Sequence, residues 1–103
     1  MAEIRFLPPA AKFFKKIKDK KLKKIFESTI KLIADDPTIG EAKIGDLAGI
    51  YCYDVYYART NYEIAYTIDV NESGDIVVII MSGTRENFYE QLKNYIRSNY
   101  NEL

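Results

Sequence analysis

The sequence predicts a small α+β domain with a short N-terminal strand, two helices, a three-stranded antiparallel meander and a C-terminal helix. Three observations predict this order. Apolar residues recur at three- and four-residue spacing over 22–33, two alternating runs flank a polar break at 59–61, and residues 76–81 are apolar without interruption. A chain of 103 residues has room for one domain. We therefore expect residues 1–103 to form a single folded unit.

The N-terminal segment predicts a strand followed by a helix. Residues 3–6 alternate between charged and apolar side chains, which is the period of a strand with one buried face. Pro8-Pro9 ends that strand and suits the start of a helix, because the first helical residues need no intrahelical N–H partner. The apolar edge of this helix consists of Phe13, Phe14 and Ile17.

The second helix has the clearest pattern in the chain. It follows a break near Asp19-Lys20, and its repeating positions share one helical face. Asp35-Asp36-Pro37 ends it, because the residue before a proline avoids helical backbone angles. A loop over 38–48 follows, with a short extended piece at 42–44. The residues of the shared face are Leu22, Ile25, Phe26, Thr29, Ile30 and Ile33.

Three further runs predict the antiparallel sheet. Residues 50–57 and 62–68 alternate on either side of a turn at Arg59-Thr60-Asn61, which indicates a hairpin. Tyr62 and Tyr66 belong to its core face. A second turn at 71–75 leads into 76–81, whose continuous apolar run is typical of a strand covered on both faces.

The last helix is expected to open at residues 83–87. Ser82 or Thr84 is its expected N-cap, and a good cap stabilises a helix by about 1 kcal/mol. The side chains that can pack this helix onto the sheet are Phe88, Leu92, Tyr95 and Ile96.

Composition excludes several classes of site. The chain has no histidine, so Ser–His triads, Cys–His pairs and His-ligated metals are absent. A single cysteine, Cys52, allows neither an internal disulfide nor a cysteine-based zinc site, and we expect it to be an inert strand residue. We expect no cofactor. Residues 1–7 are too short and too mixed for us to expect a signal peptide, and no apolar run approaches the roughly 20 residues of a membrane helix. The expected location is the cytoplasm, with no membrane partner.

The net charge of zero hides an asymmetry along the chain. Residues 1–31 hold ten of the fifteen Lys and Arg residues and three of the fifteen Asp and Glu residues. Such a basic surface can attract RNA, DNA or an acidic protein segment, and it can equally be a solvated helical face. Its densest part consists of Lys12, Lys15, Lys16, Lys18, Lys20, Lys21, Lys23 and Lys24.

Three segments carry a resemblance to a known family. Asp36-Pro37-x-x-Gly40, followed by 44–47 and 49–51, resembles the loop before the sheet in the RelE/ParE toxin superfamily. Residues 61–68 resemble the tyrosine-bearing strand of that superfamily. Residues 83–89 resemble its final segment, in which an arginine and a tyrosine follow the last strand. The resemblance covers nearly the whole chain.

The resemblance implies a toxin of a type II toxin–antitoxin system, held silent by a cognate antitoxin protein. RelE-like members cut messenger RNA in the ribosomal decoding site, whereas ParE-like members bind DNA gyrase and cleave nothing. The implied partners are therefore the antitoxin, with either the ribosome and mRNA or DNA gyrase. We expect the antitoxin to lay a helix or a strand over the toxin surface.

The chain departs from the RelE-like catalytic pattern. RelE-like enzymes supply lysines on the first hairpin strand and an arginine after the tyrosine of the second. Here Asp54 and Tyr56 occupy the first strand, and Glu63 follows Tyr62. A carboxylate repels a phosphate, so these replacements matter to the chemistry. The remaining candidate catalytic residues are Arg85, Tyr89, Arg59 and Glu63.

Three of these four candidates also have a structural explanation. Arg85 can hold a phosphate near a helix N-terminus, or it can pair with Glu86 or Glu90. Tyr89 can protonate a leaving group or stack on a base, although half-buried packing is the stronger expectation. Glu63 can act as a general base, although a solvated strand residue is the stronger expectation.

Three functions remain open from the sequence. The favoured one is ribosome-dependent mRNA cleavage, because Arg85 and Tyr89 are spaced like catalytic residues. The alternatives are ParE-like inhibition of gyrase without catalysis, and a module that has lost toxicity and only binds an antitoxin. The acidic replacements on the hairpin favour both alternatives.

Overall fold

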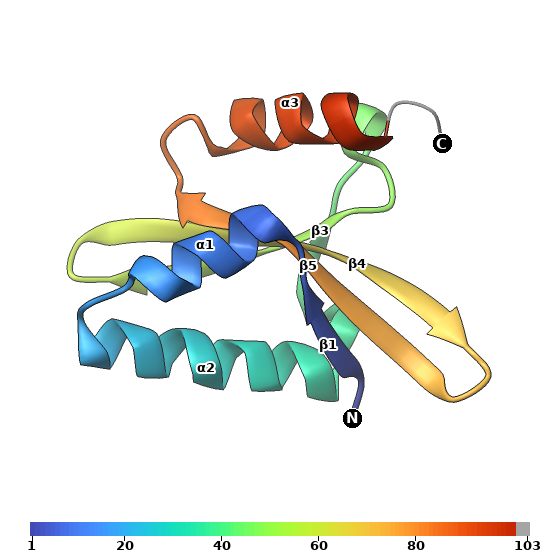
Figure 1. Ribbon diagram of the computed structural model, residues 1–103, viewed down its shortest axis with the longest axis horizontal. Coiled ribbons are helices and arrows are strands. Elements are labelled where there is room, and N and C mark those ends of the chain that lie inside the picture. Colours follow the sequence, from blue (N-terminus) through green and yellow to red (C-terminus); the bar gives the residue numbers. More distant parts are fainter. Residues whose placement is uncertain (101–103) are drawn as a thin grey trace.

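The computed structural model describes residues 1–100 and contains a five-stranded mixed sheet in the order β1-β5-β4-β3-β2 (Figure 1). The first strand pairs parallel to the last, and every other pair is antiparallel. This arrangement confirms the predicted α+β class. The strands are β1 (Glu3–Phe6), β2 (Glu41–Ala42), β3 (Tyr51–Tyr57), β4 (Thr60–Asn71) and β5 (Gly74–Thr84).

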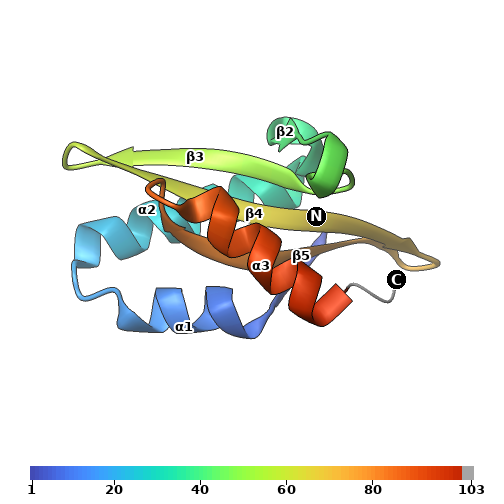
Figure 2. The ribbon, with the colours of Figure 1, turned by 90° about the horizontal axis from the view of Figure 1, so that it is seen from above.

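Three helices cover the sheet, two on one face and one on the other (Figures 1 and 2). Asp19 caps the second helix, since its Oδ1 accepts hydrogen bonds from the backbone N–H groups of Lys21 and Leu22. Within residues 1–100, no helix is long and apolar enough to cross a membrane. The helices are α1 (Pro8–Lys16), α2 (Lys20–Asp35) and α3 (Phe88–Tyr100).

The larger core lies between the sheet and the helix pair α1–α2. The predicted face of α2 points into it, with Phe26 1% exposed, and the rings of Phe13, Phe14 and Tyr62 pack edge-to-face with Phe26. Tyr66 is fully buried in the same core. The predicted core positions of Tyr62 and Tyr66 are confirmed.

The smaller core lies under α3. Phe88 and Leu92 are its buried helical residues, and Tyr95 and Ile96 pack against it as predicted. Alternating residues of β5 supply both cores, and one extra residue in the strand places both Ile80 and Met81 on the α3 side. The pairing shifts from Ala65↔Met81 to Tyr66↔Ile79, which leaves Ile80 as a bulge. The predicted double-sided burial of this strand is confirmed.

Tyr66 ties the loop after α2 to the sheet. Its hydroxyl donates to the carbonyl of Pro37 at 2.6 Å and accepts from the N–H of Gly40 at 3.0 Å. A Cβ on residue 40 would lie 2.4 Å from that hydroxyl, so any other residue there would displace the Tyr66 side chain. This anchor fixes the start of the segment that carries β2.

Two sequence expectations about element boundaries were wrong. Ser82 and Thr84 do not cap α3, because both lie in β5 and Thr84 still pairs with Tyr62. The sheet ladder continues through the N–H of Arg85, which bonds the carbonyl of Asn61 at 2.9 Å, so the helix begins only at Phe88. The extended piece expected at 42–44 is β2 and lies at Glu41–Ala42, one residue earlier.

Replacing Tyr66 by phenylalanine should detach the loop while leaving the ring packing intact. The loss of two hydrogen bonds from a buried hydroxyl should lower the free energy of unfolding by about 1–2 kcal/mol in urea titrations. Tyr62→Phe on the same strand is the matched control and should change stability by less than about 0.5 kcal/mol. Equal effects from the two variants would contradict the anchoring role.

Candidate functional site

An open pocket of about 430 Å³ lies on the α3 face of the sheet. It is formed where β3, the β2 segment and the start of α3 meet, so residues far apart in sequence line it together. The lining includes two cations, two acids, two phenols and a thiol. They are Lys43, Arg85, Glu41, Asp54, Tyr53, Tyr89 and Cys52, and Ile39 completes the lining.

Strand register places the acidic residues at this pocket. Asp54 pairs directly with Glu63 across β3 and β4, and Cys52 pairs with Ala65. Because alternate residues of a strand face opposite sides, these positions point toward α3, away from the helix pair. Glu63 thus lies beneath the pocket, where the first turn of α3 covers it.

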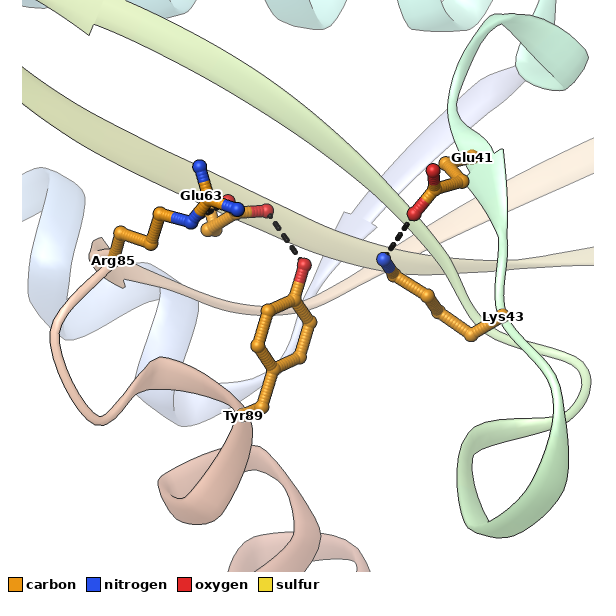
Figure 3. A network of polar contacts seen from close by, with 5 residues as sticks. All are labelled: Glu41, Lys43, Glu63, Arg85 and Tyr89. Atoms are coloured by element: carbon orange, nitrogen blue, oxygen red, sulfur yellow. Dashed lines mark hydrogen bonds and ion pairs between the residues drawn. The ribbon is translucent and has the colours of Figure 1, made fainter.

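Glu63 joins the helix start to the sheet. The Tyr89 hydroxyl donates to Oε1 of Glu63 at 3.2 Å, and Nε of Arg85 lies 3.8 Å from Oε2 (Figure 3). The Glu63 side chain is 1% exposed and that of Arg85 is 60% exposed. Among residues 1–100, Oε2 has no hydrogen-bond partner. The carboxylate is therefore desolvated and incompletely compensated.

These surroundings raise the pKa of Glu63 to about 7. Burial is the largest cause, and the neighbouring Asp54 carboxylate adds to it, first by accepting a hydrogen bond from the protonated form of Glu63 and then by repelling a second negative charge. The Tyr89 hydroxyl and the Arg85 guanidinium act in the opposite direction and do not restore the ordinary value. The carboxyl group can therefore both accept and release a proton near neutral pH.

Lys43 is a second cation of the pocket and was missed by the sequence analysis. It forms an ion pair with Glu41, and its ammonium nitrogen lies 4.9 Å from the centroid of the Tyr89 ring. The Glu41 contact is the main reason that its pKa is raised, so it stays charged. The pKa of Tyr89 is also raised, mainly by burial, so its hydroxyl stays protonated at neutral pH.

The structure brings three of the four predicted site residues together. Arg85 and Tyr89 line the pocket, and Glu63 contacts both. Arg59 lies at the tip of the β3–β4 hairpin, outside the lining. The expectation that Glu63 is solvated was wrong, because α3 covers the middle of β4.

The structure also tests the expectations for Arg85 and Cys52. Arg85 pairs with Glu63, not with Glu86 or Glu90. Cys52 is buried, and burial raises the pKa of its thiol to about 12, which keeps it protonated. Within the described residues, no cluster of three or more His, Cys, Asp or Glu side chains could hold a metal ion.

Comparison with known proteins identifies the family. Residues 4–93 match the sequence model of the ParE-like toxins of type II bacterial toxin–antitoxin systems, so the chain belongs to that family. No sequence among curated proteins matches the chain.

Solved structures of low sequence identity share the fold. The free-state structure of an arginine-to-alanine double mutant of E. coli toxin RelE has a TM-score of 0.68 at 18% identity, over 94% of this chain and 98% of that one. The Agrobacterium tumefaciens YoeB/ParE toxin has a TM-score of 0.66 at 15% identity, over 81% and 98%. The intact E. coli RelBE toxin–antitoxin complex has a TM-score of 0.63 at 17% identity, over 81% and 95%.

The raised pKa of Glu63 predicts a specific pH dependence of stability. The folded state binds the proton more tightly than the unfolded state, whose Glu pKa is near 4.5, so the free energy of unfolding falls as pH rises from about 4.5 to 7. For the wild type, this fall should be about 1–3 kcal/mol between pH 5 and 8. Glu63→Gln removes the titrating group and should largely abolish it.

Urea titrations across that range test this prediction. Glu90→Gln, at an exposed position of α3, is the matched control and should keep the wild-type slope. Asp19 and Asp36 have lowered pKa values, so they affect stability only below this range. A Glu63→Gln variant with the wild-type slope would show that the carboxyl has an ordinary pKa.

Proposed function

We propose that this toxin cleaves messenger RNA on the ribosome, using the pocket beside the start of α3. The observation that carries the proposal is the hydrogen bond from Tyr89 to a buried carboxyl whose pKa is about 7, with Lys43 and Arg85 on either side. A phenol backed by a base and flanked by two cations is suited to transfer of a phosphoryl group. It requires neither a histidine nor a metal.

The proposed step uses Tyr89 as the group in contact with RNA and Glu63 as the proton store behind it. The Tyr89 oxygen takes the proton of a ribose 2′-hydroxyl as the Tyr89 O–H passes its own proton to Oε1 of Glu63. The 2′ oxygen then bonds to the adjacent phosphorus, and the bond to the 5′ oxygen breaks. The leaving oxygen takes a proton from water, which gives a 2′,3′-cyclic phosphate and a 5′-hydroxyl end.

The two cations stabilise the charge that builds up on the phosphate. Arg85 is more than half exposed despite its contact with Glu63, so its guanidinium fork remains accessible to phosphate oxygens. Lys43 stays charged at neutral pH and acts as a fixed cation, since a raised pKa makes it a poor proton donor. The loop anchored by Tyr66 positions this lysine.

Inhibition of DNA gyrase is the second candidate. The matching family is described as ParE-like, and Asp54 lies on the strand where RelE-like enzymes have cations. A binding function would tolerate both features. In either case we propose that a cognate antitoxin silences the toxin, as the RelBE complex with the same fold illustrates.

Inducible expression of wild type, Arg85→Ala and Tyr89→Phe tests the proposal. Wild type should arrest growth and produce new 5′ ends within translated messages. Arg85→Ala removes a phosphate contact, and Tyr89→Phe removes the proton path while keeping the ring. Each should reduce cleavage by about 10²-fold or more. Arg97→Ala, at an exposed position of α3, is the control and should behave as wild type.

Each alternative outcome has a distinct meaning. Arrest without new 5′ ends, together with loss of supercoiling by purified gyrase, would replace cleavage by gyrase inhibition. Absence of arrest would contradict both candidates and leave a domain that keeps the fold and antitoxin binding alone. Cleavage that survives Tyr89→Phe would exclude the proton path through Glu63.

A further inference from the structure

One end of the molecule gathers cations that the pocket does not use. The α1–α2 junction and the tip of the β3–β4 hairpin lie at this end in both views (Figures 1 and 2). The Tyr57 hydroxyl bonds Oδ2 of Asp19 at 3.0 Å and holds the two segments together. We call this surface the cationic end, and its side chains are Lys18, Lys20, Lys21 and Arg59, all exposed.

Most of the charge of the cationic end is not neutralised within the chain. Among residues 1–100, no ion pair joins any of its four side chains to a carboxylate. The one acid between them is Asp19, whose oxygens already accept from two backbone N–H groups of α2 and from Tyr57. The lysine and arginine head groups are therefore free to bind an external anion.

Helix and turn preferences disfavour lysine in the first turn of α2 and arginine at the hairpin tip. The first turn of α2 contains no acid, and lysines there face the positive end of the helix dipole. Ala58 and Arg59 form the hairpin tip with φ angles of 51° and 66°, a conformation that glycine and asparagine adopt more readily. Packing does not explain Arg59, since its side chain is exposed at the tip.

The chemistry of the surface favours a nucleic-acid backbone over an acidic protein. Protein interfaces usually centre on buried apolar or aromatic anchors, and none of the large exposed apolar side chains lies between residues 8 and 31. Tyr56 is exposed near the tip, but it lies on the opposite face of β3 from Tyr57. Without an aromatic platform for stacking bases, the surface suits a duplex better than a single strand.

We propose that the cationic end docks on the phosphate backbone of duplex RNA, as a surface separate from the pocket. The choice of RNA and of the ribosome as its source rests on the proposed function, whereas binding to a duplex phosphate backbone does not. The α1–α2 junction belongs to the helix pair on one face of the sheet, and the pocket opens on the α3 face. One RNA can therefore hold the toxin while another enters the pocket.

Fluorescence anisotropy with a labelled RNA duplex of roughly 20 base pairs tests this surface. The test variant is Lys18→Gln/Lys21→Gln/Arg59→Asn, in which asparagine suits the left-handed conformation at position 59. It should bind about tenfold or more weakly than wild type. The slope of log affinity against log salt should become smaller by about 2 to 3. The matched control is Lys31→Gln/Lys93→Gln/Arg97→Gln, which removes the same charge elsewhere and should bind within about twofold of wild type.

Two further arms separate this inference from its alternatives. Arg85→Ala should bind the duplex as wild type does, even if it abolishes cleavage, so failure of the pocket chemistry would not affect this result. Equal losses in the test and control variants would overturn the proposal, because binding would then depend on overall charge. Tighter binding of polyglutamate than of RNA, lost only in the test variant, would replace RNA by an acidic protein partner.

Discussion

Burial of β4 between two helical layers is the constraint on which the rest of this structure depends. Residues 63–66 of this strand are all buried, so each side chain must suit the layer that covers it. Ile64 and Tyr66 face the helix pair, and Ala65 faces α3. Glu63 is the exception, because an ionisable group occupies an α3-facing position. Tyr89, in the first turn of α3, donates a hydrogen bond to this carboxylate. Arg85, just after the end of β5, forms an ion pair with it.

This constraint connects folding to the proposed chemistry. Charging a carboxylate in that position costs free energy, and its pKa rises in consequence. Ionised Glu63 destabilises the fold at neutral pH. It can serve in catalysis only if it exchanges a proton with the pocket, and the hydrogen bond from the Tyr89 hydroxyl provides the path for that exchange. The departure from the RelE-like pattern at this position is thus compatible with catalysis reorganised around a carboxyl group. The cationic end would add RNA affinity without entering the reaction.

Periodicity predicted the elements of the fold because both cores follow simple spacing. Spacing alone predicted the buried face of α2, the core positions of the hairpin tyrosines and the burial of β5 on both faces. The start of α3 was not, because sheet pairing through Thr84 overrode the capping preference of serine and threonine. The two-residue β2 was misplaced by one residue, since so short a strand has too few residues to show a period.

The site was only partly predictable, because its members come from separate segments. Arg85 and Tyr89 were found through their spacing, but the burial of Glu63 depends on α3 packing across β4. Lys43 lies in an irregular segment and carried no sequence signal. Pairing of β2 with β3, the hydrogen bond from the Lys43 N–H to the carbonyl of Ile50 and the Tyr66 anchor bring it to the pocket.

The measurement that tests the account most directly is a ¹³C NMR titration of the Glu63 side-chain carboxyl in the intact toxin. The account predicts a midpoint near pH 7, moving toward the ordinary value in Asp54→Asn, because that variant removes the neighbouring negative charge. A wild-type midpoint near 4.5 would contradict it. Glu63 would then be an ordinary carboxylate paired with Arg85, unable to accept a proton through Tyr89 at neutral pH.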